Sequence, residues 1–461
     1  MTRHVAVIDI GKTNAKLALV DGQSLSEISV ITRPNTVLPG PPYPHFDVEG
    51  HWEFLLDGLC DFHVQHGIDA ISITTHGACA ALLDAQGGLA APILDYEHSG
   101  PDEAFDAYSE MRPPFAETGS PRLAGGLNIG AQLFWQFQCD ASLKERTAQI
   151  VTYPQYWGAR LTGVMATDVT SLGCHTDLWI PSDGRFSSLV ERLGIAEKLA
   201  AVRKPHDVLG PLLPLVAERT GLPPETPVYC GIHDSNASLL PYVQAENPPF
   251  SVISTGTWVI AMSVGGKPVE LDPHLDTLIN VTAFGQPAPS ARFMGGREHD
   301  LATGGISAEP TAEDLHFVLS NRVMLLPALA PDSGPFKGRV SAWVGEEPDT
   351  GTGRRGAAVA LYLALVTAEC LSNIGHDGHI IVEGPFAGNH LYLQMLSVAM
   401  AADVFRSSGT TGTSSGAAML ALGETKARPI TDHPITVRAE DERLLQDYAA
   451  VWRQTVHHQA H

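Results

Sequence analysis

Residues 4–20 read HVAVIDIGKTNAKLALV, two runs of β-branched and aliphatic residues joined by Gly11-Lys12-Thr13-Asn14. Two short apolar runs around a turn-forming tetrapeptide predict a β-hairpin. A Gly-Lys-Thr sequence also occurs in the P-loop, but that motif requires a glycine where this chain has Ala6, and a helix after the lysine. Residues 15–20 have the composition of a strand, so the sequence predicts a hairpin turn instead.

This turn can bind phosphate. Its backbone N–H groups, the Thr13 hydroxyl and the ammonium groups of Lys12 and Lys16 can surround an anion without a helix. Asp9, at the end of the first strand, can hold Mg²⁺ directly or through water. The alternative is a solvated hairpin with ordinary turn residues, and this segment alone does not decide between the two.

A second hairpin is predicted over residues 250–261, FSVISTGTWVIA, with Thr255, Gly256 and Thr257 in its turn. The Pro-containing loop before it indicates a boundary between domains 1–246 and 247–461. Strands and helices alternate along the chain, which favours an α/β fold. Two similar turns, each opening one half of such a chain, suggest a nucleotide held between two related domains.

Asp234 follows a predicted buried strand at residues 226–232 and opens a helix. It can act as a base that takes the proton of a hydroxyl nucleophile, with His233 beside it to bind a sugar hydroxyl. Phosphoryl transfer depends on positioning and charge neutralisation and does not need a strong base. The alternative is that Asp234 only caps the helix.

Thr75-His76-Gly77 lies at the end of a strand predicted over residues 69–74. Gly77 would let a ligand approach the backbone, and His76 could hydrogen-bond to hydroxyl groups; otherwise the segment is a β-turn that contains a histidine. Residues 407–416 are rich in Gly, Ser and Thr and are either a phosphate or adenine contact or a flexible loop. The chain has 20 histidines but no HExxH motif, and no metal site formed by protein ligands alone is expected.

The composition limits the partners and the compartment. The 461 residues include 29 basic and 51 acidic side chains, for a net charge of −22, which disfavours nucleic acids and anionic membranes while permitting one compact anion. Six scattered cysteines form no CxxC pair, so reduced thiols in a cytoplasmic protein are expected. The longest apolar run, residues 357–366, is too short for a membrane span, and no signal sequence is evident.

Six segments, in this order, resemble those of the FGGY carbohydrate kinases, a family of the actin-like ATPase superfamily. The resemblance covers nearly the whole chain. The segments are residues 9–16, 73–84, 226–234, 254–258, 382–389 and 415–418.

The resemblance implies two actin-like (ribonuclease H-like) ATPase domains with a central interdomain cleft, ATP and Mg²⁺ as cofactors, and a sugar as substrate. Asp234 would be the catalytic base, and Asp9 and Asp234 would hold Mg²⁺ through water. The implied sugar contacts are Thr75, His76, Gly77, His233 and Asp234. The implied ATP contacts are Asp9, Gly11, Lys12, Thr13, Asn14, Lys16, Thr255, Gly256, Thr257, Gly384 and Asn389.

Three details are similar to the L-fuculokinase and L-rhamnulokinase branch of the family: His233-Asp234, Thr257-Trp258 and the Thr-X-Gly of residues 75–77. They imply transfer of the γ-phosphoryl group of ATP to a 6-deoxyketohexose such as L-fuculose or L-rhamnulose. A homodimer is compatible with this expectation. The positions that depart from the family pattern are His76, Cys79, Gln132, Glu383 and Pro385.

Two other functions remain open on the sequence. One is a kinase of pentuloses or polyols, such as D-xylulose, D-ribulose or erythritol. The other is a sugar- or nucleotide-binding protein without turnover on the same scaffold. Retention of Asp9, both hairpins and Asp234 argues against the second, because a silent site would not need them. An actin-like polymer is expected least.

Overall fold

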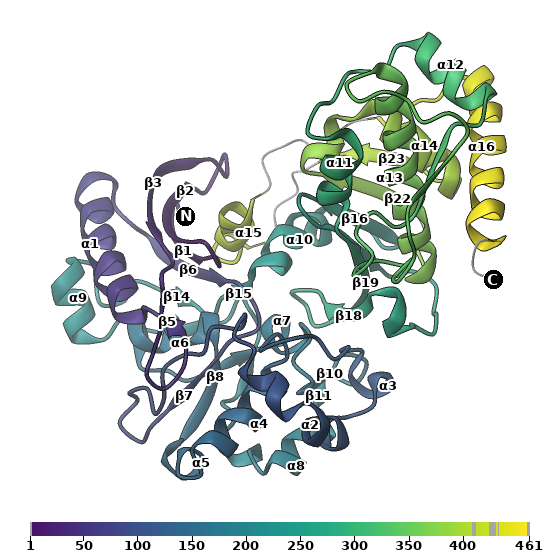
Figure 1. The fold of residues 1–461 in the computed structure, drawn as a ribbon. Helices are drawn as coiled ribbons and strands as arrows, with labels where there is room; N and C mark the ends of the chain where they lie inside the picture. Colours follow the sequence, from purple (N-terminus) through teal and green to yellow (C-terminus); the bar gives the residue numbers. More distant parts are fainter. Residues whose placement is uncertain (1, 408–411, 424–429, 432, 459–461) are drawn as a thin grey trace. The chain divides into compact units, whose positions relative to one another are not determined.

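The computed structural model describes residues 2–407, 412–423, 430–431 and 433–458, which belong to two compact units (Figure 1). Unit 1 consists of residues 1–245, 279–287 and 410–428, and unit 2 of residues 246–278, 288–409 and 429–461. The first division lies one residue before the predicted boundary. Two later segments return to unit 1, so a single boundary does not describe how the chain is distributed.

A mixed sheet forms the centre of unit 1. Strands β1 and β2 make the predicted hairpin, β6 runs parallel to β1, and β15 runs parallel to β6. The order across the sheet is β13 (Val208–Gly210), β14 (Val228–Tyr229), β6 (Ala70–Thr75), β1 (His4–Ile10), β2 (Asn14–Asp21) and β3 (Glu27–Pro34), with β15 (Ile232–His233) also on β6.

Helices cover both faces of this sheet. Ala6, Ile8 and Ile10 of β1 pack on the face covered by α1 (Val48–His66), α6 (Tyr153–Thr162) and α9 (Pro214–Thr220). Val5 and Val7 pack on the other face, against α10 (Asp234–Ala245) and α15 (Thr413–Met419). Successive side chains of a strand point to opposite faces, so a strand buried on both sides must be apolar throughout, as β1 is.

The remainder of unit 1 contains a smaller hydrophobic cluster around α4 and the β7–β8 pair. Its elements are β4 (Val37–Leu38), β5 (His45–Phe46), β7 (Ala80–Leu83), α2 (Phe105–Met111), α3 (Phe115–Thr118), α4 (Ile129–Cys139), α5 (Leu143–Arg146), β8 (Gln149–Thr152), β9 (Thr167–Asp168), α7 (Val169–Leu172), β10 (Trp179–Ile180), β11 (Arg185–Phe186), α8 (Ser188–Leu193) and β12 (Val202–Arg203).

Unit 2 repeats the strand arrangement of unit 1. Its antiparallel hairpin β16–β17 has a parallel neighbour, β22, beside the first strand and an antiparallel neighbour, β19, beside the second. The order is β18 (Thr277–Val281), β19 (Pro287–Phe293), β17 (Val259–Val264), β16 (Phe250–Thr255), β22 (His379–Glu383) and β23 (Val404–Arg406). The predicted α/β class is confirmed.

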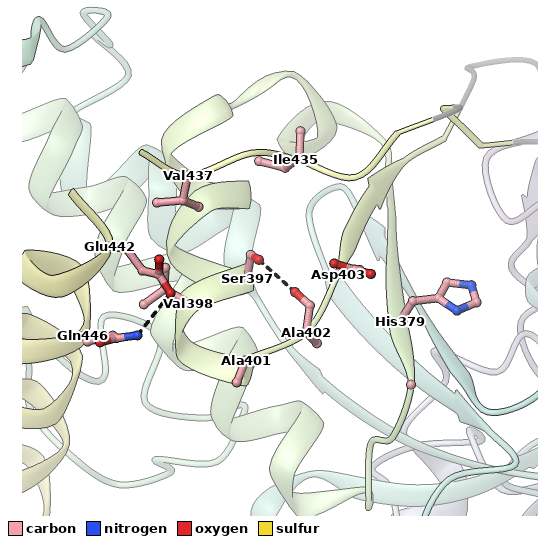
Figure 2. A pocket seen from close by; sticks show the side chains of 11 residues that line it. His379, Ser397, Val398, Ala401, Ala402, Asp403, Ile435, Val437, Glu442 and Gln446 are labelled. Atoms are coloured by element: carbon pink, nitrogen blue, oxygen red, sulfur yellow. Dashed lines mark hydrogen bonds between the residues drawn. The ribbon is translucent and has the colours of Figure 1, made fainter. Parts of the chain in front are cut away.

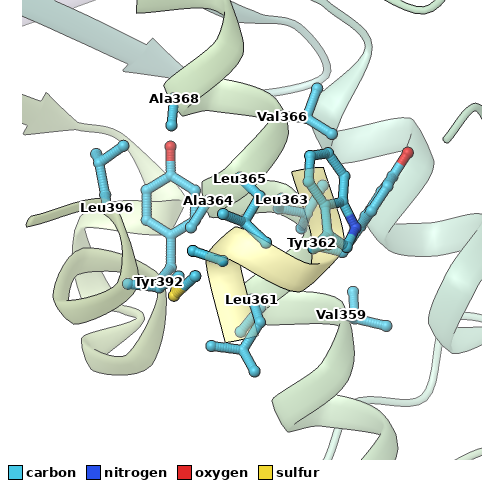
Figure 3. Packing of buried hydrophobic residues seen from close by; sticks show 14 of the residues in the cluster. Val359, Leu361, Tyr362, Leu363, Ala364, Leu365, Val366, Ala368, Tyr392 and Leu396 are labelled. Atoms are coloured by element: carbon cyan, nitrogen blue, oxygen red, sulfur yellow. The ribbon is translucent and has the colours of Figure 1, made fainter. Parts of the chain in front are cut away.

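The core of unit 2 is built on α13 (Gly353–Asn373), which is apolar around most of its circumference. Figure 3 shows its side chains, among them Leu361 and Tyr362, beside Tyr392 and Leu396 of α14 (His390–Met400). Of the described helices, α13 alone is long and apolar enough to cross a membrane, and 78% of its most apolar window is buried within the fold. The other elements are α11 (Gly295–Thr303), α12 (Ala312–Ser320), β20 (Met324–Leu326), β21 (Ala342–Val344) and α16 (Ala439–His458).

The strand predicted over residues 226–232 is divided into β14 and β15. Gly231 separates them with a φ of +94°. A Cβ atom there would lie 2.8 Å from the carbonyl oxygen of Ile73, so only glycine allows the chain to pass. The break lets β15 pair with the end of β6 and places His233 beside Thr75.

Candidate active site

The ends of three parallel strands bring the predicted residues of unit 1 together. Ile10 of β1 pairs with Thr75 of β6, and His233 of β15 pairs with the same Thr75. The carboxyl ends of parallel strands in an α/β sheet form one edge, where ligands commonly bind. Asp9, Thr75 and His233 therefore lie along one edge of the sheet.

The turn of the first hairpin is held by its own backbone and by Asn35. Gly11 donates from its N–H to the carbonyl oxygen of Asn14 at 2.9 Å. The amide of Asn35 donates to Gly11 O at 2.8 Å, and its backbone N–H donates to Thr13 O at 2.9 Å. Thr13 and Asn14 are exposed, so their polar groups are accessible to a ligand.

Asp9 is buried at the base of this turn. Its Oδ2 lies 3.2 Å from Lys16 Nζ and accepts hydrogen bonds from the hydroxyls of Thr413, at 2.6 Å, and Ser414, at 3.3 Å. Both hydroxyls come from the start of α15. They belong to the Gly/Ser/Thr-rich segment seen in the sequence, of which residues 408–411 lie outside the described residues.

The Lys12 side chain contacts acidic and aromatic residues of unit 1. Its ammonium group forms a close ion pair with Asp95 and lies 3.1 Å from Glu97 Oε2. It also lies 4.8 Å from the ring centroid of Tyr96 and 5.2 Å from that of Phe46. The lysine assigned to ATP phosphate from the sequence is thus bound by two carboxylates. None of these four neighbours was predicted from the sequence.

His76 lies among the aromatic rings of Phe46, Tyr96 and Tyr153, at centroid distances of 5.1–5.2 Å. Its Nδ1 is 2.9 Å from Gly77 O; because a carbonyl only accepts, Nδ1 carries the hydrogen. Burial lowers the pKa of His76 to about 4, so the ring is neutral and Nε2 is an acceptor. Nε2 is buried and has no hydrogen-bond partner within the described part of the chain.

His233 lies between two hydrogen-bond acceptors. Its Nε2 is 3.2 Å from Asp234 Oδ1, and its Nδ1 is 2.8 Å from Asn236 Oδ1. Burial alone would lower the pKa of His233, but the neighbouring Cys174 and Asp234 raise it, to about 10. Both ring nitrogens then donate. Gly77 is required beside this ring, because a Cβ atom there would lie 2.6 Å from Nε2.

Asp234 begins α10, and its side chain is 32% exposed. Its Oδ1 accepts hydrogen bonds from the backbone N–H of Ser235, at 2.6 Å, and from the Ser235 hydroxyl, at 3.2 Å. Oδ2 accepts none from the residues that the structure describes. One oxygen is therefore fixed and the other is left for a ligand hydroxyl.

In unit 2, the hydroxyl of Thr255 is buried and used inside the fold. It donates to the carbonyl oxygen of Glu383 at 2.5 Å and accepts from the backbone N–H of Phe386 at 3.0 Å. It thereby connects the β16–β17 turn to the segment that contains Gly384. Thr257 is exposed and keeps its hydroxyl accessible.

A hollow of about 750 Å³ in unit 2 brings Gly256 and Thr257 together with Asn389. Its wall includes the start of α11, where Gly296 donates from its N–H to Thr257 O at 3.2 Å. Arg297 follows; it is exposed and has no hydrogen bond or ion pair with a described residue. Arg297 was not predicted from the sequence, although a Gly-Gly-Arg sequence that opens a helix after a strand was an available signal. Gly384 does not line this hollow.

A second hollow in unit 2, also about 750 Å³, is lined by residues of β22, α14 and α16 and of the segments that precede β23 and α16 (Figure 2). His379, Asp403 and Glu442 are its titratable side chains. It contains none of the predicted site residues.

Within the described residues, no three His, Cys, Asp or Glu side chains gather into a metal site. Asp9 Oδ2 is occupied by Lys16, Thr413 and Ser414, whereas Asp9 Oδ1 and Asp234 Oδ2 have no hydrogen-bond donor among the described residues. Mg²⁺ prefers oxygen ligands and usually retains several waters. One open carboxylate oxygen on each residue fits an ion held mainly through water.

Two domain models of one protein family match the chain along its length. The model of the FGGY family of carbohydrate kinases, N-terminal domain, matches residues 4–241, which is more than half of the chain. The chain belongs to the FGGY family. The model of the carbohydrate kinase FGGY C-terminal domain matches residues 247–429. The recognition made from the six sequence segments is confirmed.

Curated relatives match part of the chain. L-fuculokinase of Escherichia coli is 24% identical over 275 residues, 56% of this chain and 56% of the enzyme. Ribulokinase of Halalkalibacterium halodurans is 24% identical over 314 residues, 59% of this chain and 55% of the enzyme. The chain thus spans little more than half the length of these curated relatives.

Solved structures match nearly the whole chain. A carbohydrate kinase from Novosphingobium aromaticivorans is 36% identical, with a TM-score of 0.90 and 99% of both chains covered. Ligand-bound xylulose kinase from Lactobacillus acidophilus is 16% identical, with a TM-score of 0.78, covering 99% of this chain and 98% of that one. The second likeness shows the fold alone. Together they confirm the predicted two-domain kinase fold.

Proposed function

We propose that this protein is an ATP-dependent sugar kinase that transfers the γ-phosphoryl group to a hydroxyl of a ketose. A 6-deoxyketohexose such as L-fuculose or L-rhamnulose is the first candidate substrate. The observation that carries the proposal is Asp234: one oxygen is fixed by Ser235, the other is open, and His233 lies against it. The match to L-fuculokinase supports this choice of sugar.

In this proposal Asp234 Oδ2 accepts the proton of the attacking hydroxyl, and the hydroxyl oxygen forms the new bond to phosphorus as the bond to the ADP oxygen breaks. The doubly protonated His233 donates a charge-assisted hydrogen bond to Asp234 and orients its carboxylate. Mg²⁺, when bound, would neutralise phosphate charge next to Asp9 and Asp234. Transition-state charge on the phosphoryl group is the main target of catalysis in this reaction.

The nucleotide is proposed to bind unit 2. Thr257, the Gly256 turn and the start of α11 line one hollow with Asn389, and helix N-termini favour anions. Arg297 adds a cation without a carboxylate partner among the described residues. Residues 1–246 would form the sugar-binding domain and residues 247–461 the adenosine-binding domain.

A cytoplasmic location is part of the same proposal. All six cysteines are free in the structure, as expected of a reducing compartment. A homodimer remains compatible with it.

A pentulose or polyol kinase is the second candidate, because ribulokinase is also among the relatives. ADP release measured over a panel of ketoses and polyols would distinguish the two candidates. Preference for D-ribulose, D-xylulose or erythritol over 6-deoxyketohexoses would favour the second. Binding of ATP and sugar with no ADP formed from any of them would favour a binding protein without turnover.

Asp234→Asn tests the base directly. The amide preserves shape but cannot accept the proton, so kcat should fall about a hundredfold or more while the melting temperature stays within a few degrees. Asp447→Asn, an exposed change in α16, is the matched control and should behave as wild type. Asp234→Asn retaining near-wild-type turnover would refute the assignment.

A further inference from the structure

Lys12 and its neighbours form a charged and aromatic cluster in unit 1. We call it the Lys12 cluster; it consists of Lys12, Asp95, Glu97, Phe46, Tyr96 and His76. All six residues lie between residues 12 and 97 of unit 1. The cluster joins the hairpin turn to His76 at the end of β6, because the rings of Phe46 and Tyr96 contact both the ammonium group and the imidazole.

The charges of this cluster oppose phosphate binding by Lys12. Asp95 and Glu97 together bring two negative charges to one ammonium group. A polyphosphate placed at Lys12 would be repelled by both carboxylates. The Asp95 side chain is only 10% exposed, so its charge is weakly screened by solvent.

The hydrogen-bonding capacity of the cluster matches a different ligand. Two of the three N–H groups of Lys12 are directed to Asp95 and Glu97, which leaves one for a ligand oxygen. Asp95 Oδ1 accepts from Lys12 and from the N–H of Glu97 at 3.2 Å, whereas Oδ2 has no donor among the described residues. His76 Nε2 is likewise an acceptor without a donor.

A buried acceptor without a donor, such as His76 Nε2, carries a free-energy cost that a donor removes. Here the acceptors outnumber the donors, so a fitting ligand must bring O–H groups. A carboxylate brings none and adds charge of the wrong sign. Gly77 places this cluster next to His233, which contacts Asp234.

We propose that Lys12 is a substrate-specificity residue that binds, together with Asp95 and His76, hydroxyl groups of a neutral ketose or polyol, and that it does not bind ATP phosphate. The proposal rests on the proposed kinase function and adds a residue that selects its substrate: the cluster favours uncharged polyhydroxyl compounds over sugar acids. Lys12 binds and orients the end of the substrate that is remote from the reacting hydroxyl, while Asp234 takes the proton of that hydroxyl.

The test compares wild type, Lys12→Met and the double variant Lys12→Met/Asp95→Asn. The double variant removes both charges, so Asp95 is not left buried and unpaired if the single variant folds poorly. Steady-state kinetics with ATP are measured over neutral ketoses, polyols and aldonates. Lys267→Met, at a lysine whose side chain is 69% exposed in unit 2, is the matched control.

We expect Lys12→Met and the double variant to raise the KM for the preferred sugar about tenfold or more, as for loss of a charge-assisted hydrogen bond. The KM for ATP should stay within about twofold of wild type. A higher KM for ATP with an unchanged KM for the sugar would overturn the proposal, as would no change in either. Preference of the wild type for an aldonate over every neutral compound would also overturn it.

A binding measurement separates this proposal from the kinase function. If the wild type forms no ADP with any compound, the kinase function falls. The sugar-dependent rise in melting temperature then tests Lys12 alone. Its presence in wild type and loss in both Lys12 variants would support the proposal, and its absence in wild type or persistence in both variants would refute it.

Discussion

His233 is subject to two opposing influences that set its charge. Burial favours the neutral ring, while Cys174 and Asp234 favour the imidazolium, and the two neighbours prevail. The same contact acts on the thiol: burial would raise the pKa of Cys174, but His175 and His233 lower it, to about 5. A charged pair of Cys174 and His233 thus lies beside the proposed base, and it keeps both imidazole nitrogens as donors.

This pair predicts a particular dependence of stability on pH. Unfolded histidine and cysteine titrate near 6.5 and 9.0. Between these values the folded pair and the unfolded pair each hold one proton, so the pair contributes no pH dependence. Below pH 6.5 the unfolded state binds the extra proton, so stability falls as the pH drops toward 5. Above pH 9.0 the folded state holds the extra proton, so stability falls as the pH rises toward 10.

Cys174→Ser should weaken both limbs of this dependence. The variant loses the thiolate, which is the largest of the influences that raise the pKa of His233, so the charged pair is no longer formed. The difference in unfolding free energy between wild type and variant should change by about 1.4 kcal/mol per pH unit where the folded and unfolded states of the pair differ by one proton. Denaturant unfolding of both proteins from pH 5.5 to 9.5 measures this. A difference independent of pH would contradict the charged pair.

Among the secondary-structure elements, the second hairpin is tied at its turn to the segment after β22 by the side chain of Thr255. Thr255 Oγ1 joins the end of β16 to Glu383 and Phe386. Gly384 is needed beside it, since a Cβ atom there would lie 2.0 Å from Thr255 O. Thr255 thus fixes the turn that presents Thr257. This role differs from the direct contact between its hydroxyl and phosphate that the sequence suggested.

Thr255→Val tests this role. Valine keeps the branched shape but leaves the N–H of Phe386 and the carbonyl of Glu383 without their partner, a loss of about 1–3 kcal/mol. We expect a lower melting temperature and a KM for ATP raised several-fold, with the KM for the sugar unchanged. Thr255→Ser, which restores the hydroxyl, should recover both values. Failure of Thr255→Ser to recover both values would point to packing instead of the bridge.

At the scale of the whole molecule, unit 1 is not formed by one continuous stretch of chain. Residues 412–423 return to it, and Ala417 and Met419 pack with Val5 and Val7 of β1. Gly416 is tightly placed, since a Cβ atom there would lie 1.8 Å from Ala237 O of α10. One face of the first sheet is therefore completed by residues more than 400 positions away.

A chain of residues 1–246 alone should fold poorly for this reason. It retains β1 and β6 but lacks α15, so buried apolar side chains on that face would be exposed to water. We expect it to aggregate or to lack a cooperative thermal transition by circular dichroism. Fusing residues 412–423 through a flexible linker should restore the transition. A cooperative transition in the unfused fragment, at the temperature of the full chain, would disprove the dependence.

Much of the architecture was available in the sequence. The two hairpins, β22, α13 and the helix after Asp234 follow from local apolar patterns and turn residues. The break of the strand at Gly231 could not be predicted from the sequence, because it depends on the close approach of Ile73 from another strand. The roles assigned to the individual site residues from the sequence stay predictions, and the structure supplies their neighbours.

The sequence by itself determined the α/β class, the family and the positions of Asp9, His233 and Asp234 at strand and helix ends, since these depend on local pattern and motif order. Tertiary structure alone decided what these residues touch. Lys12 meets Asp95 across 83 positions of sequence, and Asp9 meets Thr413 across 404. Pairings at such separations depend on how the sheets and helices pack, and that packing is recorded in no local stretch of residues.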